Sequence, residues 1–355
     1  MLQQANEQGG GGIKQGWLTA LLLLALGGLT LLGAIWLFFR NPQTESSEVG
    51  AITVYTTLNE SEALVYLRDF QLVFPQIEVN LVRQPINQLV ARLLAEQESA
   101  QADVVWGVGL RNMLLLEWND LLTPYAPVGS ARLRSRFIDS GTPPYWSGLY
   151  LSPTAFCINS DAAARRGLPT PRSWRDLIKP AYRRSLIMPN PTTSTAGLAV
   201  VLAIFELYGE QDAWRYLDAL QKNIATYTED DTTVCQMVGR GDYPIGITDE
   251  HQESLQMIYP SEGSGWEMMV SGLVRKDSIH PAARTFLDWA VSKSVMPLYA
   301  HKSPLTAMKT GASLPTTYPS DAEALLLEED PSWGAANRSR ILREWQRRYG
   351  GQVNE

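Results

Sequence analysis

Cysteine and histidine are scarce in this sequence. Its 355 residues include two cysteines and three histidines. Cys157 and Cys235 are too few for a disulfide framework. Both lie in apolar stretches, so we expect buried free thiols, with a bridge between them as the open alternative. The histidines His251, His280 and His301 lack the spacing of a metal site, and we expect no metal or other cofactor.

Catalytic motifs and an excess of positive charge are also missing. The sequence has no G-x-S-x-G nucleophile elbow, no H-E-x-x-H, no P-loop and no dinucleotide fingerprint. Asp249 and Glu250 are adjacent, so in a strand their carboxylates point to opposite faces and do not form a catalytic pair. We therefore expect no enzymatic activity. The net charge of −7 argues against nucleic acid as a partner.

The first feature present is an uncharged apolar segment at residues 17–39. At ~1.5 Å per residue it is long enough to cross a ~30 Å hydrocarbon core, and Trp17 and Trp36 lie near its ends. It has no convincing small-residue cleavage site and no cysteine, so we expect an uncleaved transmembrane anchor rather than a signal peptide or a lipoprotein. Lys14 and Arg40 flank it on opposite sides and leave the orientation poorly determined. Residues 1–16 are then a cytoplasmic tail, and residues 40–50 a tether.

Beyond the tether, strand-like and helix-like segments alternate. Strands are expected at residues 51–57, 76–82 and 102–106, with helices at 60–74 and 86–97 between them. This order predicts a parallel sheet with helices on both faces. Ligands in such sheets bind beyond the carboxyl ends of the strands, which here are Thr56, Thr57 and Trp106. Trp106 is equally compatible with simple packing.

A hydroxyl-rich stretch, NPTTSTAG at residues 190–197, follows a short strand and precedes a long apolar helix. Thr193, Ser194 and Thr195 are expected at the N-terminus of that helix, where unpaired N–H groups and the macrodipole favour an anion. For any one of these residues, N-capping is the simpler interpretation. The run exceeds what one cap needs, so the stretch as a whole indicates a ligand site.

A second α/β unit continues through a helix at 212–221 and a strand at 243–248. That strand runs into Asp249, Glu250 and His251, a polar cluster at a strand end. His251 is the histidine favoured for function because of its place among carboxylates. A basic helix at residues 338–349 closes the chain, and a solvated face is its simplest interpretation.

Several segments together resemble the type II periplasmic substrate-binding proteins of ABC importers. The matching segments are VYTT at 54–57, ADVVW at 102–106, PRSWRDL at 171–177, the stretch at 190–197, NIATYT at 223–228 and GDYPIGI at 241–247. They resemble the branch that includes ferric-iron, 2-aminoethylphosphonate, hexose-phosphate and phosphoglycerate binders. The resemblance covers residues 51–350. It implies a bilobal α/β fold, with lobe 1 at 51–150 and 265–355, lobe 2 at 151–264, and a hinge that closes over the ligand.

The resemblance also implies which residues meet the ligand. Iron-binding members carry a pair of adjacent tyrosines after the second-lobe strand, whereas this chain has ITDEH at 247–251. It is more similar to the binders of phosphorylated solutes. By that resemblance, the hydroxyl residues of both lobes hold a phosphate or phosphonate, and the polar cluster contacts an amine or sugar hydroxyls. The implied ligand-binding residues are Thr56, Thr57, Trp106, Thr193, Ser194, Thr195, Asp249, Glu250, His251 and Glu267.

Two outputs of such a receptor are compatible with the sequence. In the first, a monomeric periplasmic domain, anchored in the inner membrane by a single helix, delivers a small anionic solute to an ABC permease. In the second, the same closed form acts on a membrane sensor kinase, for which an uncleaved anchor would be useful. Ferric-iron binding is the alternative for the ligand.

Overall fold

The computed structural model describes residues 50–252, 254–309, 318 and 322–352. The expected anchor at 17–39, with its tail and almost all of its tether, lies outside these residues. Within the described part of the chain, no helix is long and apolar enough to cross a membrane. The prediction of a transmembrane anchor therefore stays a prediction.

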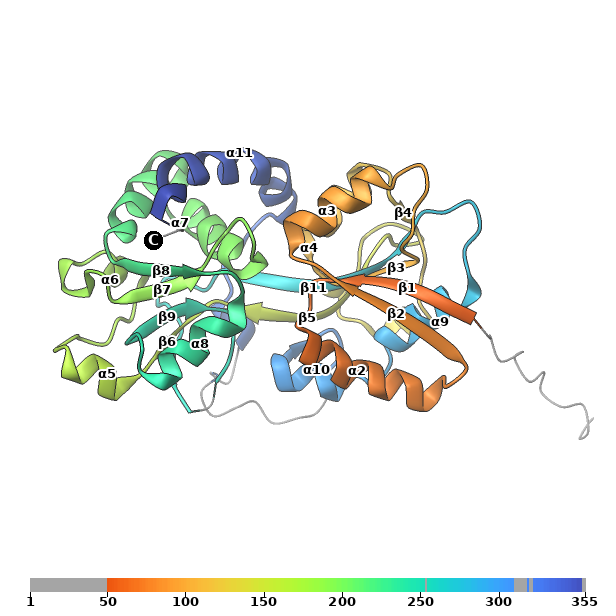
Figure 1. The fold of residues 1–355 in the computed structure, drawn as a ribbon, viewed down its shortest axis with the longest axis horizontal. Helices are drawn as coiled ribbons and strands as arrows, with labels where there is room; N and C mark the ends of the chain where they lie inside the picture. Colours follow the sequence, from red (N-terminus) through yellow and green to blue (C-terminus); the bar gives the residue numbers. More distant parts are fainter. Residues whose placement is uncertain (1–49, 253, 310–317, 319–321, 353–355) are drawn as a thin grey trace, which may run out of the picture. The chain divides into compact units, whose positions relative to one another are not determined.

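Two mixed β-sheets form the centres of two lobes (Figure 1). The first sheet has the strand order β12-β5-β11-β3-β1-β2, with β4 paired to β11. Its strands are β1 (Gly50–Thr56), β2 (Ile77–Arg83), β3 (Val104–Gly109), β4 (Leu122–Thr123), β5 (Ser147–Pro153), β11 (Trp266–Val274) and β12 (Leu305–Thr306). The expected parallel pairing is confirmed for β1 with β2 and β3, whereas β11 runs antiparallel to β3.

The second sheet has the order β10-β6-β9-β7-β8. Its strands are β6 (Ala155–Ile158), β7 (Leu186–Pro189), β8 (Ile224–Thr228), β9 (Ile245–Thr248) and β10 (Gln256–Ile258). The chain passes from the first sheet to the second between β5 and β6, and it returns between β10 and β11. Because β5 and β11 are paired with each other, the two connections lie side by side and form the hinge (Figure 1).

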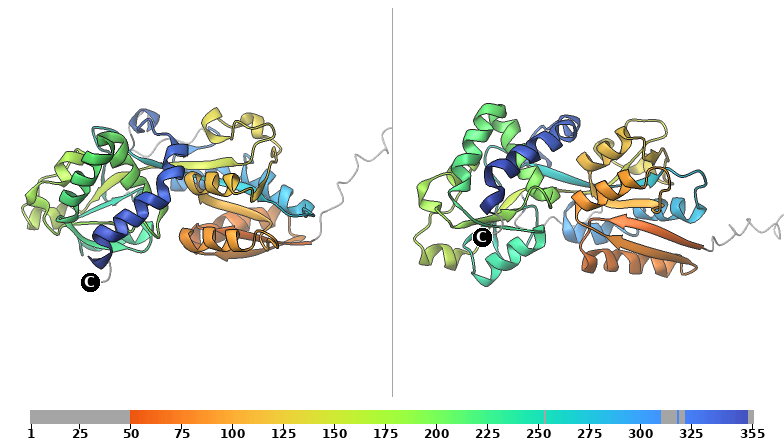
Figure 2. Two further views of the ribbon diagram at one scale, coloured as in Figure 1. Left: turned by 90° about the horizontal axis from the view of Figure 1, so that it is seen from above. Right: turned by 45° about the horizontal axis from the view of Figure 1, so that its top comes forward.

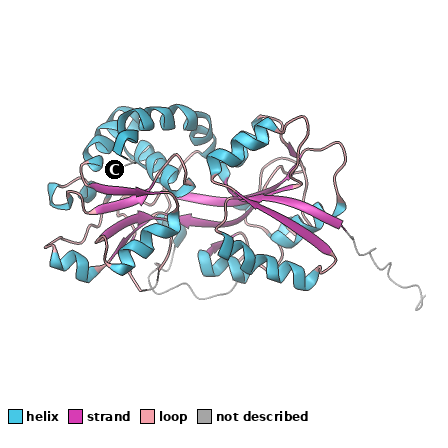
Figure 3. Ribbon diagram, viewed as in Figure 1, coloured by secondary structure: helices cyan, strands magenta, loops and turns pink. Residues whose placement is uncertain are grey.

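Helices cover both faces of each sheet (Figure 3). The first lobe carries α2 (Glu60–Val73), α3 (Ile86–Ala95), α4 (Leu110–Trp118), α9 (Pro281–Ala290) and α10 (Met296–Lys302). The second carries α5 (Ser160–Arg165), α6 (Trp174–Leu177), α7 (Thr195–Gln221), α8 (Asp231–Arg240) and α11 (Pro331–Tyr349). Single 3-10 turns lie at Ser130–Arg132, Ser135–Phe137, Pro180–Tyr182, Ala322–Leu325 and Gly350–Gln352. Helix α7 is broken at Gly209, whose φ of 70° is non-helical.

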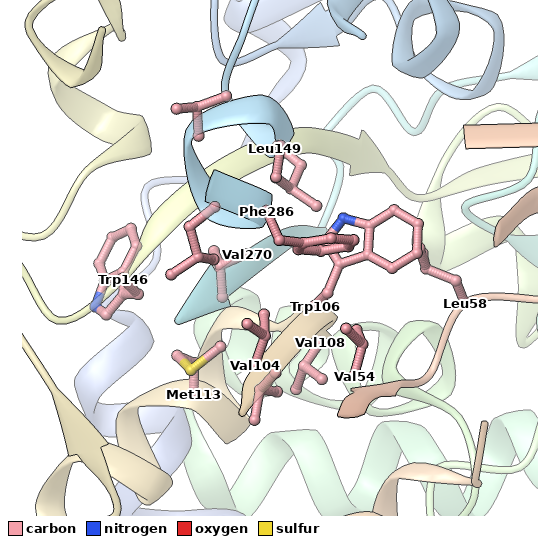
Figure 4. Packing of buried hydrophobic residues seen from close by; sticks show 14 of the residues in the cluster. Val54, Leu58, Val104, Trp106, Val108, Met113, Trp146, Leu149, Val270 and Phe286 are labelled. Carbon is pink, nitrogen blue, oxygen red and sulfur yellow. The ribbon is translucent and has the colours of Figure 1, made fainter. Parts of the chain in front are cut away.

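The core of the first lobe contains Trp106, which is fully buried. Its indole packs against Phe286 (Figure 4) at a centroid distance of 5.4 Å, and its N–H donates to the hydroxyl of Tyr299 at 3.3 Å. Of the two interpretations of Trp106, packing is therefore the one the structure shows, because β3 directs this side chain under α9 and α10.

The C-terminal helix contacts both lobes. Ile341, Leu342, Trp345 and Tyr349 of α11 are buried in the core of the second lobe, and Figure 2 shows α11 (blue) packed over that lobe. The C-terminal half of α11 therefore packs in lobe 2, while its N-terminal half contacts α4 of lobe 1. The predicted bounds of the lobes stay a prediction. Four arginines of α11, at 340, 343, 347 and 348, lie on its exposed face, whereas Arg338 is buried.

Candidate functional site

A polar pocket of about 190 Å³ lies between the two lobes. The hinge strands contribute Tyr150, Ser152 and Met269. The first lobe lines it with Thr57, Leu58, Asn59, Glu62, Arg83, Pro85, Ile86, Gln88 and Lys302. The second lobe adds Thr193, Ser194, Thr195, Glu229, Asp230, Asp231, Asp249 and Glu250.

Four helix N-termini meet at this pocket. Helices α2 and α3 follow β1 and β2 in the first lobe, and α7 and α8 follow β7 and β8 in the second. In each case the residues just before or at the start of the helix line the pocket. A helix N-terminus carries about half a positive elementary charge and unpaired N–H groups. The backbone alone therefore favours an anion here.

The N-terminus of α7 is arranged for both capping and binding. The Ser194 hydroxyl accepts from the N–H of Gly197 at 2.9 Å and so caps the helix. The N–H groups of Thr195 and Ala196 have no acceptor among the described residues. Gly197 allows this helix to start close to β7, because a Cβ there would lie 2.6 Å from the carbonyl oxygen of Pro189. The capping interpretation thus accounts for Ser194, and two N–H donors remain for a ligand.

Acidic side chains are the most numerous charged groups of the pocket. The carboxylates are those of Glu62, Glu229, Asp230, Asp231, Asp249 and Glu250, against the cations of Arg83 and Lys302. Burial raises the pKa of Asp231 to about 6, although a hydrogen bond from Ser194 opposes the shift. Burial, together with the charges of Asp231 and Glu250, raises the pKa of Asp249 well above its ordinary value. Both carboxyl groups would be stabilised in their charged form by a nearby cation.

Lys302 is the cation that the protein itself supplies. Its ammonium group pairs with Glu250 and lies 3.9 Å from Glu62. Glu62 also accepts hydrogen bonds from the hydroxyls of Tyr66 and Tyr150, at 2.8 Å and 2.9 Å. Burial lowers the pKa of Lys302, but the adjacent carboxylates outweigh this effect and raise it. Lys302 therefore stays charged and neutralises part of the acidic cluster.

Two polar contacts join the lobes across the pocket. Lys302 of the first lobe pairs with Glu250 of the second. The Asn59 amide at the N-cap of α2 donates to the hydroxyl of Thr232 in the first turn of α8. These contacts require the lobes to be close, so the structure represents a closed arrangement.

Six of the ten predicted ligand-binding residues line the pocket: Thr57, Thr193, Ser194, Thr195, Asp249 and Glu250. Three others do not. Thr56 is fully buried, and its hydroxyl accepts from the N–H of Leu58 at 3.1 Å, a local turn bond. Trp106 belongs to the core. The His251 ring packs on Tyr318 at a centroid distance of 5.2 Å.

Glu267, the tenth, is buried in a different charged group, which we call the hinge cluster and define as Arg111, Glu267 and Glu329. Glu267 accepts from the N–H of Leu110 at 3.0 Å, at the start of α4, and lies 3.5 Å from the Arg111 guanidinium. Arg111 also pairs with Glu329 and donates to the carbonyl of Trp266 at 3.0 Å. Burial raises the pKa of Glu329 to about 7. Glu267 therefore stabilises the hinge and does not line the pocket.

The main pocket residues that the sequence analysis missed are Glu62, Arg83, Asp231 and Lys302. Arg83 ends β2 and Glu62 lies in the first turn of α2, so the rule that ligands bind beyond strand ends would have found both. Asp231 begins α8 after β8 in the same way. Lys302 gives no such signal, because it lies at the last residue of α10 and far along the chain from its partners.

The comparisons with known proteins agree with this architecture. Residues 102–332 match the model of the bacterial extracellular solute-binding protein family. The chain belongs to this family. A probable ABC transporter periplasmic-binding protein of Sinorhizobium fredii is 25% identical over 72% of this chain and 77% of its own length.

Two solved structures are similar in fold. The periplasmic binding protein AfuA of Actinobacillus pleuropneumoniae, with fructose-6-phosphate bound, has a TM-score of 0.76 and 21% identity, and covers 86% of this chain and 99% of its own. Iron-bound HitA of Pseudomonas aeruginosa has a TM-score of 0.69 and 19% identity, and the match covers 83% of this chain and 98% of HitA. At these identities the likeness concerns the fold.

Proposed function

We propose that this protein captures a small solute bearing both a phosphoryl or phosphonyl group and an amine, and delivers it to an ABC importer. The observation that carries the proposal is the combination, in one pocket, of four helix N-termini with a cluster of buried carboxylates. The first feature favours an anion and the second a cation. A zwitterion such as an aminoalkylphosphonate has both.

The anionic group of the solute is best served by neutral donors. The Thr195 hydroxyl and the N–H groups of Thr195 and Ala196 have no acceptor among the described residues and are the donors available to it. The hydroxyls of Thr57 and Thr193 already donate to the carbonyl oxygens of Gly107 and Glu229, at 2.6 Å and 2.9 Å. Arg83 lines the pocket and makes no ion pair within the described part of the chain, so its guanidinium is available to a phosphonate. Such charge-assisted bonds are stronger than neutral ones.

The amine of the solute has its partners in the second lobe. Burial raises the pKa values of Asp231 and Asp249, and the charge of Asp231 adds to the shift at Asp249, so an ammonium group placed between them would favour the charged form of both. A sugar phosphate or a phosphoglycerate would offer hydroxyls instead of an ammonium group, and would leave these two raised pKa values without compensation. The pocket should therefore bind an amine-bearing phosphonate more tightly than a sugar phosphate or a phosphoglycerate.

Closure of the lobes is the mechanism by which binding is signalled. The ligand contacts both lobes and therefore stabilises the closed arrangement relative to an open one, by as much as its affinity differs between the two. The contacts of Lys302 with Glu250 and of Asn59 with Thr232 form only in that arrangement. A permease, or in the alternative output a sensor kinase, then recognises the closed form.

Ferric iron is the second candidate ligand, supported by the fold likeness to an iron-bound protein. The pocket carries hard oxygen donors in its carboxylates and in Tyr150. It lacks paired tyrosines, and Tyr150 is already hydrogen-bonded to Glu62 at 2.9 Å. Among the described residues, no group of three or more acidic, histidine or cysteine side chains has the arrangement of a metal site. The phosphonate proposal therefore explains more of the pocket.

The test is a thermal-shift comparison of matched ligands with the full chain. 2-Aminoethylphosphonate should raise the melting temperature strongly, because a ligand at a hundredfold excess over its Kd stabilises by about 2.7 kcal/mol. Ethylphosphonate lacks only the amine and should give a small shift, as should glucose 6-phosphate and 3-phosphoglycerate. A larger shift with ferric citrate, together with a charge-transfer absorption band, would sink the proposal in favour of iron.

Variants locate the effect in the pocket. Thr195→Val removes the pocket hydroxyl that has no acceptor among the described residues, and it should weaken binding of phosphonates with and without the amine. It is preferable to Ser194→Ala, which also removes a helix cap. Asp242→Asn, a change to an exposed carboxylate paired with Arg240, is the matched control and should leave the shifts unchanged.

A further inference from the structure

The two cysteines of the chain lie together in the second lobe. Cys157 is on β6 and Cys235 is on α8, far apart in the sequence. Both are buried, with exposed fractions of 0% and 3%, in a small core that also contains Val234 and Val238. They are free thiols in this structure. Neither takes part in the proposed binding of a solute.

Their side chains are neighbours in this core. Cys157 pairs in register with Gly246 of β9, and the absence of a side chain at that glycine leaves room for its sulfur. A Cβ at Gly246 would lie 2.7 Å from Cys157 Sγ and 2.5 Å from Val234 of α8. Cys157 therefore lies directly beneath the helix. The neighbouring Cys157 thiol and burial raise the Cys235 pKa.

We propose that Cys157 and Cys235 form a disulfide bond in the mature protein. The family to which the chain belongs is extracellular, and disulfides form and persist in the oxidising compartments outside the cytoplasm. Two neighbouring thiols that a disulfide donor can reach in such a compartment are expected to be joined.

The reaction is thiol–disulfide exchange with an external disulfide, either that of an oxidising protein or glutathione disulfide. The thiolate of one cysteine attacks a sulfur of the donor, which gives a mixed disulfide and releases one donor thiolate. The thiolate of the other cysteine attacks the mixed disulfide at the sulfur of the first, which closes the intramolecular bond and releases the second donor thiolate. Two protons are lost from the protein, and the donor takes up two electrons.

Burial fixes when this reaction takes place. In the folded lobe both sulfurs are inaccessible, and the raised pKa of Cys235 keeps it in the unreactive thiol form. Exchange must therefore precede the packing of α8 on the sheet, during folding.

The bond would fix the helix that carries the acidic side of the pocket. Asp230 and Asp231 lie at the N-terminus of α8, about one turn from Cys235. The Cys235 thiol also lies 3.8 Å from the carbonyl oxygen of Glu250, to which it donates. A disulfide to β6 would hold α8 against the sheet and so hold these carboxylates in position in the open and the closed arrangement alike.

The test is refolding of the full chain from denaturant in a glutathione redox buffer. The product is then denatured again without reductant, alkylated, and analysed by mass spectrometry. We expect no alkyl group on either cysteine, and a proteolytic fragment in which the peptides of Cys157 and Cys235 are joined. Two alkylated thiols, or a glutathione adduct on each cysteine, would overturn the proposal.

A double variant tests whether a disulfide bond, rather than the packing of two thiols, raises the melting temperature. The oxidised wild-type chain should unfold at a higher temperature than the same chain refolded in dithiothreitol, because the bond restricts the unfolded state. The variant with Cys157→Ala and Cys235→Ala should show the same melting temperature with and without dithiothreitol. If the wild-type chain also shows no difference, while linked peptides are absent, the two residues are a packing pair only.

Discussion

Two buried groups of charge lie near the hinge, and only one of them lines the pocket between the lobes. In the hinge cluster, Arg111 lies between Glu267 and Glu329, and all three side chains are at most 4% exposed. In the pocket, Lys302 lies between Glu62 and Glu250, with side-chain exposures of 14% to 19%. Both groups combine one cation with an excess of carboxylates. They differ in what surrounds them.

The surroundings decide which group is suited to a ligand. Burial raises the pKa of Glu267 and of Glu329 as well, but Arg111 and the N–H of Leu110 are their partners and both side chains are at most 4% exposed. Asp231 and Asp249 have raised pKa values and lie next to open space. A buried carboxylate therefore indicates a binding site when it combines access with an uncompensated charge, and burial alone is insufficient.

The largest expected effect concerns stability. Arg111→Met should lower the free energy of unfolding by about 3–5 kcal/mol, because it leaves two carboxylates buried without a partner. Lys302→Met is the matched change in the pocket and should cost less than about 2 kcal/mol, since solvent reaches Glu62 and Glu250 there. Urea unfolding of both variants measures the difference. Equal losses would show that the two clusters are alike.

The next effect concerns affinity. Asp249→Asn should weaken binding of 2-aminoethylphosphonate by about 2 kcal/mol or more, because the amine loses a desolvated charge partner. Ethylphosphonate should bind the variant as it binds the wild type. Glu267→Gln should leave both affinities nearly unchanged while it lowers stability. Isothermal titration gives the affinities, and a loss of affinity in Glu267→Gln would return that residue to the binding site.

The sequence predicted the lobes and the strand-end position of the site, and it missed features that depend on contacts distant in sequence. Thr57, Thr193, Asp249 and Glu250 could be found because they follow strands directly. Lys302 could not, because its partners at 62 and 250 are brought to it only by the fold. The position of Glu267 outside the pocket lining could not be predicted for the same reason, because its partner Arg111 is brought to it only by the fold.

A smaller effect is expected from pH. The pKa of Asp231 in the ligand-free protein is about 6, and a bound ammonium group lowers it. Affinity for 2-aminoethylphosphonate should then be full above pH 6 and should fall below it, by about tenfold per pH unit for each proton displaced. Titration of the wild type and of Asp231→Asn from pH 5 to 7 checks this. In the variant, the affinity for 2-aminoethylphosphonate should depend on pH only as much as the affinity for ethylphosphonate does.

The raised pKa of Asp231 also makes the stability of the ligand-free protein depend on pH. A higher pH strengthens ligand binding but lowers the free energy of unfolding. Because the folded pKa of Asp231 is raised above the unfolded value of 3.8, the native state holds the proton more tightly. Asp231 therefore lowers stability as pH rises from about 4 to 6, by about 3 kcal/mol, and the loss is complete above pH 6. Asp231→Asn should remove this decline in the free energy of unfolding. Unfolding measurements on the wild type and the variant from pH 4 to 7 give the difference. Parallel profiles would contradict the assignment of the shifted carboxyl.

The smallest expected effect concerns closure of the lobes at the pocket. Asn59→Ala removes the bond to Thr232 across the pocket, a hydrogen bond worth about 1 kcal/mol. Since Asn59 also precedes α2 without capping it by a side-chain bond, the helix should persist. The variant should populate the open arrangement more, so small-angle scattering should give a larger radius of gyration without ligand and the wild-type value with saturating ligand. Binding should weaken by about fivefold. A variant with unchanged scattering and affinity would mean that the contact with Thr232 adds nothing to closure, and that Lys302 with Glu250 is the bond that holds the lobes together.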